Sequence, residues 1–158
     1  MIAPRVRKIE IEIGAIDVEN PVARLPGEVG IATLLEDLAP KACRALWEAL
    51  PIETRTIHVF WQGQAWRTEG NYPLLPVNEP PENPASETQL VPGDIVYFAP
   101  RNTGLFKVMM VYGRATAGRD VQACLIAKVE GNLEGLVRMS RRILYEGPKI
   151  VNIRRAGE

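Results

Sequence analysis

Side chains able to act as nucleophiles, general bases or metal ligands are few in this sequence. His58 is the only histidine, Ser86 and Ser140 are the only serines, and Cys43 and Cys124 are the only cysteines. One serine lies in a proline-rich segment and the other in a basic run, so neither sits on the strained elbow that exposes a hydrolase nucleophile. One histidine and two distant cysteines argue against a zinc site. We therefore expect no Ser-His-Asp hydrolase, no metal and no other cofactor.

The position of His58 on a predicted strand limits the roles that this histidine can have. Thr54–Trp61 is rich in β-branched and aromatic residues, which predicts a strand. Because side chains alternate along a strand, His58 shares a face with Thr56 and Phe60, and this face could border a ligand groove. The competing interpretation is a neutral, hydrogen-bonded or rim histidine.

The elements expected to position these residues are mostly short strands. Isoleucines alternate with charged residues over residues 5–13, which is the period of a half-buried strand. Apolar residues at helical spacing predict a helix over Pro40–Leu50, with Trp47 in the core, and a second helix capped by Asn132. Further strands are predicted at Val29–Leu35, Ala65–Thr68, Ile95–Ala99, Leu105–Tyr112, Val121–Val129 and Lys149–Arg154. Many short strands with two helices indicate a mainly β, closed sheet or barrel.

Composition limits the classes of partner. The chain has 158 residues, of which 46% are hydrophobic, and its 19 Lys+Arg balance its 19 Asp+Glu. This composition predicts one soluble globular domain over residues 1–158. Zero net charge disfavours nucleic acid and anionic membranes as partners, and we find neither a leader segment nor an apolar run of membrane-spanning length. We expect a cytoplasmic protein.

The balanced charge is unevenly distributed along the chain. Five acidic residues and no basic ones lie between Thr68 and Asp94, whereas six basic residues and only Glu146 lie from Arg138 to Arg155. Complementary faces of this kind predict self-association into a homo-oligomer, whose size would fall with added salt.

Several segments resemble the cyclophilin family. Ala39–Leu46, in which Pro-Lys precedes an amphipathic helix, resembles the family's first-helix segment. Asn102-Thr103-Gly104 resembles the turn that leads into its ligand-lining strand. Lys128–Asn132, followed by a helix and Lys149–Ile153, is similar to its closing strand, helix and strand. The resemblance spans roughly Ile31 to the C-terminus and implies a closed eight-stranded barrel plugged by two helices.

A smaller group of relatives fits more closely. Ala45–Pro51, Glu82-Asn83-Pro84 and Pro92–Phe98 resemble segments of small uncharacterised cyclophilin-like proteins of bacteria and archaea. Cyclophilins accelerate rotation about prolyl peptide bonds, largely through an arginine that should follow the histidine matched by His58. Here Val59 follows, and the family's pocket Trp and His have no counterpart between Ala115 and Gln122. Prolyl isomerase activity is therefore in doubt.

Our leading hypothesis is a domain that binds a small, polar, carboxylate-bearing ligand or a short peptide in a groove on the side of the barrel. Arg101 could hold a carboxylate bidentately, and Glu82 with Asn83 could form one edge; surface solubility and turn chemistry are the competing interpretations. The aromatic candidates would otherwise be packing residues. The predicted lining is His58, Trp61, Glu82, Asn83, Tyr97, Arg101 and Phe106.

Two other functions stay open. A residual isomerase would need another donor, such as Arg67 or Arg101. Alternatively, the proline-rich loop Asn71–Pro84 would present an extended surface to a partner or to a second copy of the chain.

Overall fold

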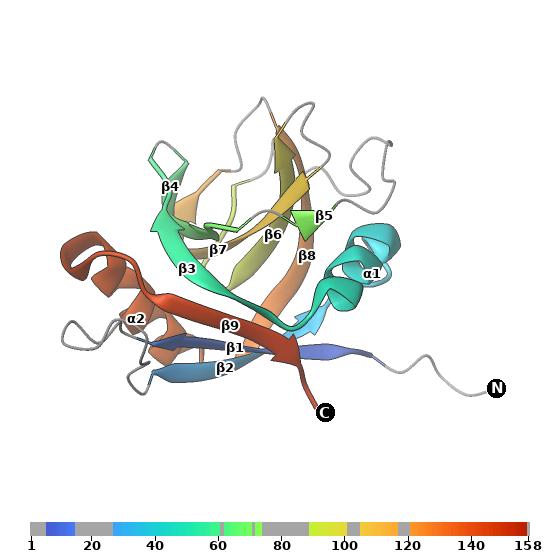
Figure 1. The fold of residues 1–158 in the computed structure, drawn as a ribbon, viewed down its shortest axis with the longest axis horizontal. Coiled ribbons are helices and arrows are strands. Elements are labelled where there is room, and N and C mark those ends of the chain that lie inside the picture. Colours follow the sequence, from blue (N-terminus) through green and yellow to red (C-terminus); the bar gives the residue numbers. More distant parts are fainter. Residues whose placement is uncertain are drawn as a thin grey trace.

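The computed structural model describes residues 6–14, 27–60, 62–70, 72–73, 89–100, 105–116 and 121–157. In these ranges the chain forms strands with one helix after the second strand and another before the last (Figure 1). The elements are β1 (Lys8–Gly14), β2 (Glu28–Leu34), α1 (Pro40–Ala49), β3 (Ile52–His58), β4 (Gly63–Thr68), β5 (Tyr72–Pro73), β6 (Asp94–Pro100), β7 (Leu105–Ala115), β8 (Val121–Gly131), α2 (Leu133–Glu146) and β9 (Ile150–Arg155).

The strands close into a ring. Their order is β4-β3-β9-β1-β2-β8-β6-β7, every neighbouring pair is antiparallel, and β7 pairs with β4 to complete the circle. The two-residue β5 adds to β7 at Leu105 and Phe106. The predicted closed, eight-stranded, mainly β barrel with two helices is confirmed. Closure leaves the eight ring strands without an unpaired edge.

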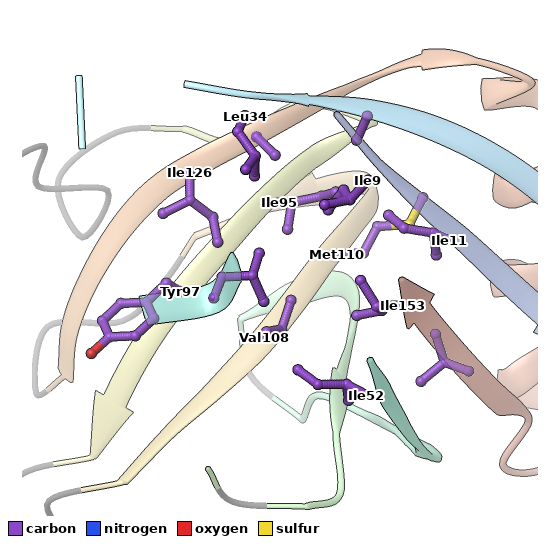
Figure 2. Packing of buried hydrophobic residues seen from close by; sticks show 14 of the residues in the cluster. Ile9, Ile11, Leu34, Ile52, Ile95, Tyr97, Val108, Met110, Ile126 and Ile153 are labelled. Carbon is purple, nitrogen blue, oxygen red and sulfur yellow. The ribbon is translucent and has the colours of Figure 1, made fainter. Parts of the chain in front are cut away.

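Alternation along the strands builds the core inside the barrel. Ile9, Ile11 and Ile13 on β1 are buried, whereas the charged residues between them face outward. Figure 2 shows that side chains from β1, β2, β3, β6, β7, β8 and β9 meet in one cluster. The helices lie on different sides of the barrel, and both bury residues in this cluster (Figure 1).

A second apolar cluster lies on the opposite faces of β4, β6, β7 and β8. Residues of these strands that alternate with the interior positions turn outward, yet they are also buried, because Val59 and Leu90 pack against them. The cluster consists of Val59, Ala65, Leu90, Val96, Met109, Val111, Ala115 and Ala123, with Phe98 and Leu125 partly buried beside it.

The two helix starts follow different rules. Pro40 occupies the first turn of α1, as predicted, where its missing N–H costs nothing. Asn132 stands at the predicted start of α2 but makes no side-chain cap, so that prediction is wrong. Its backbone is left-handed, with φ of 59°, and its amide nitrogen donates to the Glu28 carboxylate and the Val29 carbonyl. The side chain therefore ties α2 to β2.

Trp47 is not a core residue, which corrects the prediction for α1. Its ring is half-buried and lies between two guanidinium groups, with the Cζ atoms of Arg7 and Arg155 at 4.9 and 4.8 Å from the ring centroid. Arg155 also donates to the Trp47 carbonyl oxygen at 2.9 Å. This stacking joins the first strand, the first helix and the last strand.

None of the helices in the described part of the chain has the length and apolar character that a membrane crossing requires.

Candidate functional site

His58 ends β3 and is hydrogen-bonded at both ring nitrogens. Nδ1 lies 2.6 Å from the Val59 carbonyl oxygen and Nε2 lies 2.6 Å from the Tyr112 hydroxyl. Because a carbonyl oxygen only accepts, the neutral ring carries its proton on Nδ1, and Nε2 accepts from Tyr112. Burial raises the pKa of Tyr112 above its ordinary value, which keeps this phenol a donor.

Tyr97 on β6 and Phe106 on β7 form another buried aromatic pair. Their ring centroids are 4.8 Å apart, and Tyr97 is only 3% exposed. Its hydroxyl has no hydrogen-bond partner among the described residues, and Figure 2 shows it pointing away from the aliphatic side chains. Burial raises the pKa of Tyr97, so the phenol stays protonated. An unpaired buried hydroxyl is costly to the protein alone.

These two pairs are well separated. Phe106 and Tyr112 lie on the same strand and face the same interior, but six residues apart, which is about 20 Å along β7. The structure therefore brings Tyr97 to Phe106 but does not bring His58 to either. The other predicted lining residues, Trp61, Glu82, Asn83 and Arg101, lie outside the described residues. That any of the seven contacts a ligand stays a prediction.

A row of charged side chains crosses the outer face of β3, β4 and β7. Arg55 binds the Glu69 carboxylate bidentately, with both nitrogen–oxygen distances 2.7 Å. Lys107 donates from Nζ to the Glu69 backbone oxygen at 3.3 Å. Arg67, on the same face of β4, donates to the Thr68 carbonyl oxygen at 3.2 Å. Glu69 thus lies among three cations, and Arg55 is the one that binds its carboxylate.

Neither Arg67 nor Lys107 forms an ion pair with a carboxylate of the described residues, although Glu69 attracts Lys107. Both side chains are half-buried, and in the described part of the chain no carboxylate lies within ion-pair distance of either one. Burial lowers the pKa of Lys107, and the positive charge of Arg67 lowers it further, while Glu69 opposes the shift. Binding of an anion would lower the electrostatic free energy of these two neighbouring positive charges.

Apolar residues adjoin this cation pair on the neighbouring strands. Lys107 pairs in register with Phe98 on β6, and Arg67 pairs with Met109 on β7. Met109 and its register partner Val96 are buried in the outer cluster, whereas Phe98 is only partly buried at its edge. Phe98 is therefore the apolar side chain on this face that a small molecule beside the cations could contact.

The sequence carries one signal for this site. Lys107 is the single charged residue in the run Leu105–Gly113, which otherwise reads as a buried strand. A lone lysine in such a run faces solvent, an internal partner or a ligand. The sequence predicted Arg67 only as a substitute isomerase donor, because it stands 40 positions from Lys107.

Position 59 carries no substitute for the cyclophilin arginine. Val59 is 6% exposed, packs in the outer cluster and donates its backbone N–H to the Ala65 carbonyl oxygen at 3.1 Å. A search of the described residues for three or more converging histidine, cysteine or acidic side chains gave no candidate metal centre.

The basic C-terminal segment is largely paired within the chain. Arg138 binds Glu28, Arg142 and Lys149 bind Glu146, and Arg154 binds Glu10 and Glu12. In the acidic segment between Thr68 and Asp94, the Asp94 carboxylate binds Lys128 at 2.8 Å and accepts a hydrogen bond from the Val91 N–H at 2.9 Å. Self-association through charged faces stays a prediction.

Comparisons with solved structures agree on the fold. The structure of McbB in complex with tryptophan is similar over 95% of this chain, with 20% sequence identity and a TM-score of 0.60, and the chain spans 45% of McbB. The crystal structure of the Mimivirus cyclophilin is similar over 98% of this chain and 90% of that chain, with 13% identity and a TM-score of 0.55. At these identities the likeness concerns the fold, which is cyclophilin-like.

Sequence comparison gives the family. The search of curated proteins found no match to this chain. A family model described as "Protein of unknown function (DUF3830)" matches residues 26–154, which is most of the sequence. The chain therefore has a cyclophilin-like fold and belongs to the DUF3830 family.

Proposed function

We propose that this domain binds a small carboxylate-bearing ligand or a short peptide on the outer face of the barrel. The observation that carries the proposal is the cation pair formed by Arg67 and Lys107, which lacks a carboxylate partner among the described residues and adjoins Phe98 and Met109. The carboxylate would lie between the two cations, and an apolar side chain would rest against the partly buried Phe98.

The two cations would bind the ligand carboxylate in different ways. The Arg67 guanidinium offers a planar fork that matches both carboxylate oxygens, whereas the Lys107 ammonium acts as a point charge. Binding would remove the repulsion between them, and partial burial strengthens the attraction over that of a fully exposed pair. His58, Tyr97 and Phe106 would act from the interior by supporting β3, β6 and β7.

A matched pair of ligands tests the charge requirement. Calorimetry with N-acetylphenylalanine and with its primary amide isolates the carboxylate, and tryptophan is added because McbB was solved with that amino acid. We expect the free acid to bind at least about fivefold more tightly than the amide at low salt. Arg67→Gln and Lys107→Gln should each remove this preference.

Lys8→Gln provides the control, because Lys8 is a surface lysine whose charge is already paired with Glu130. This variant should keep the preference of the wild-type protein. Equal affinity for acid and amide, or a preference that survives both Arg67→Gln and Lys107→Gln, contradicts the proposed site.

A residual prolyl isomerase is a second candidate, favoured by the placement of Arg67. Val59 bonds to Ala65, and Arg67 lies two residues further along the same outer face of β4. Diagonal neighbours across antiparallel strands are about 7–8 Å apart, so the long Arg67 side chain can reach over Val59. Its guanidinium would then donate to a prolyl nitrogen. A protease-coupled assay with a proline peptide decides the matter, since no rate above background at micromolar protein rules this activity out.

A further inference from the structure

The outer face of α2 is a surface that the proposed carboxylate site does not use. The helix buries one face in the barrel core, so its opposite face points away from the strands (Figure 1). Side chains at helical spacing follow one another along this outer face, and all are exposed: Glu134, Arg138, Arg141 and Tyr145. Tyr145 is 83% exposed, so nearly its whole ring meets water unless a partner covers it.

Two opposite charges on this face have no ion-pair partner in the described part of the chain. Arg138 stands four residues after Glu134, the spacing of a pair within a helix, but binds Glu28 instead at 3.4 Å. The Glu134 carboxylate near the start of α2 is therefore left unpaired among the described residues. The same holds for the Arg141 guanidinium in the second half of the helix, whereas the other arginines of α2 are bound to carboxylates.

The spacing of Glu134 and Arg141 makes the face complementary to itself. Seven residues are nearly two full turns, so both side chains lie on one stripe, about 10 Å apart along the helix axis. A two-fold axis between residues 137 and 138 would lay a second copy of α2 against the first in the antiparallel direction. Each Glu134 would then face the partner's Arg141, and the two helix dipoles would also be antiparallel.

Apolar side chains at the two ends of α2 would meet in the same arrangement. Leu144, 53% exposed, and Tyr145 lie at the end of the helix. Val29, 39% exposed, lies beside its start, where the Asn132 amide donates to the Val29 carbonyl oxygen at 2.8 Å. Antiparallel pairing would carry the Tyr145 ring of each copy to the helix start of the other. Tyrosine and arginine are the side chains most enriched at the centres of protein interfaces.

We propose that two copies of this chain associate through the outer faces of their α2 helices, which run antiparallel and form two Glu134–Arg141 ion pairs. One helix of 14 residues per copy gives a contact smaller than about 1,200 Å², the size class of weak and transient complexes. The dimer therefore forms reversibly and weakens with added salt. This interface is independent of the proposed carboxylate site, which lies on β4 and β7.

Charge reversal tests the pairing. Sedimentation velocity of the full chain at low salt, up to millimolar protein, should show a monomer–dimer equilibrium. Glu134→Arg and Arg141→Glu should each raise the dissociation constant at least about tenfold, because like charges then meet at both pairs. An equimolar mixture of the two variants should dimerise again, since both contacts between unlike variants join opposite charges. Dimerisation of the mixture would also show that both variants are folded.

Tyr145→Ser tests the apolar contact and should weaken the wild-type dimer about fivefold. Leu38→Ser is the control, because it removes an apolar side chain of 54% exposure in the turn before α1, and it should leave the dimer unchanged. A wild-type monomer at every concentration, a dimer that either charge reversal leaves intact, or a mixture of variants that stays monomeric would overturn the proposal.

Discussion

The indole N–H of Trp66 on β4 donates to the hydroxyl oxygen of Ser140 on α2 across 2.9 Å, and both side chains are fully buried. This bond explains why a serine stands on the buried face of a helix that also buries Leu136, Met139 and Ile143. An indole inside a barrel must find an acceptor, and α2 supplies it. The helix is therefore held to the barrel by a directed bond as well as by packing.

Ser140→Ala should destabilise the protein by about 1–3 kcal/mol, because it leaves the buried Trp66 N–H without a partner. Denaturant unfolding of Ser140→Ala, Trp66→Phe and the double variant gives the coupling free energy between the two residues. We expect the double variant to be more stable than the sum of the single losses predicts. Strict additivity would show that the hydrogen bond contributes nothing.

Gly30→Ala should cost on the order of 1–3 kcal/mol, since a methyl group there has no room. An ideal Cβ at Gly30 would lie 2.4 Å from Leu136 Cδ1 and 2.8 Å from the Gly131 carbonyl oxygen. Gly131→Ala is the matched control on the paired strand, because its nearest contact would be an ordinary 3.5 Å to Ile31. Thermal unfolding of both variants should show the larger loss for Gly30→Ala, and equal losses would contradict the tight fit of β2 against α2.

Glu146→Gln should be less stable than the wild-type protein at neutral pH, with the two converging in acid. Hydrogen bonds from Arg142 and then Lys149 lower the pKa of Glu146 from its ordinary 4.5 to about 2. A carboxylate with a depressed pKa contributes stability above the unfolded-state value and loses it as pH falls through the folded-state value. The variant also leaves the ammonium of Lys149, a buried residue, without its partner.

Unfolding free energies measured between pH 7 and pH 2 check this prediction. Glu134→Gln is the control on the same helix, since no ion pair joins Glu134 to another described residue. A Glu146→Gln deficit that does not change with pH would refute the electrostatic origin.

The pKa of Lys107 should respond in opposite directions to two neutral substitutions. Arg67→Gln should raise it by removing a like charge, and Glu69→Gln should lower it by removing an attraction. A bound carboxylate should raise it as well. Titration of the lysine side-chain resonances by NMR measures all three effects. If Arg67→Gln leaves the pKa unchanged, the two cations are not close enough to share an anion.

Local patterns predicted the elements because their causes are local. Alternating isoleucines predicted β1, and the predicted strands Thr54–Trp61 and Ala65–Thr68 correspond to the paired strands β3 and β4. The many short strands already indicated a closed sheet or barrel, but the eight-stranded ring came from the family resemblance, since no local rule pairs β4 with β7.

The errors and omissions arose from partners distant in sequence. Trp47 occupies an apolar helical stripe, but Arg7 and Arg155 lie over its ring from the two ends of the chain. Asn132 precedes the helix at the position of a cap, but its side chain instead donates hydrogen bonds to Glu28 and to the Val29 carbonyl oxygen on β2. Arg67 and Lys107 are likewise 40 positions apart and become neighbours only through the pairing of β4 with β7.

The position of β9 has a consequence for synthesis of the chain. β9 lies between β1 and β3 in the ring and supplies the backbone partners of both. As the ribosome releases the chain from its N-terminus, β1 and β3 emerge long before residues 150–155. Until then the barrel has an open seam with two unsatisfied strand edges, the kind of surface that recruits foreign strands. The edges of β1 and β3 therefore stay open to foreign strands until β9 pairs with both.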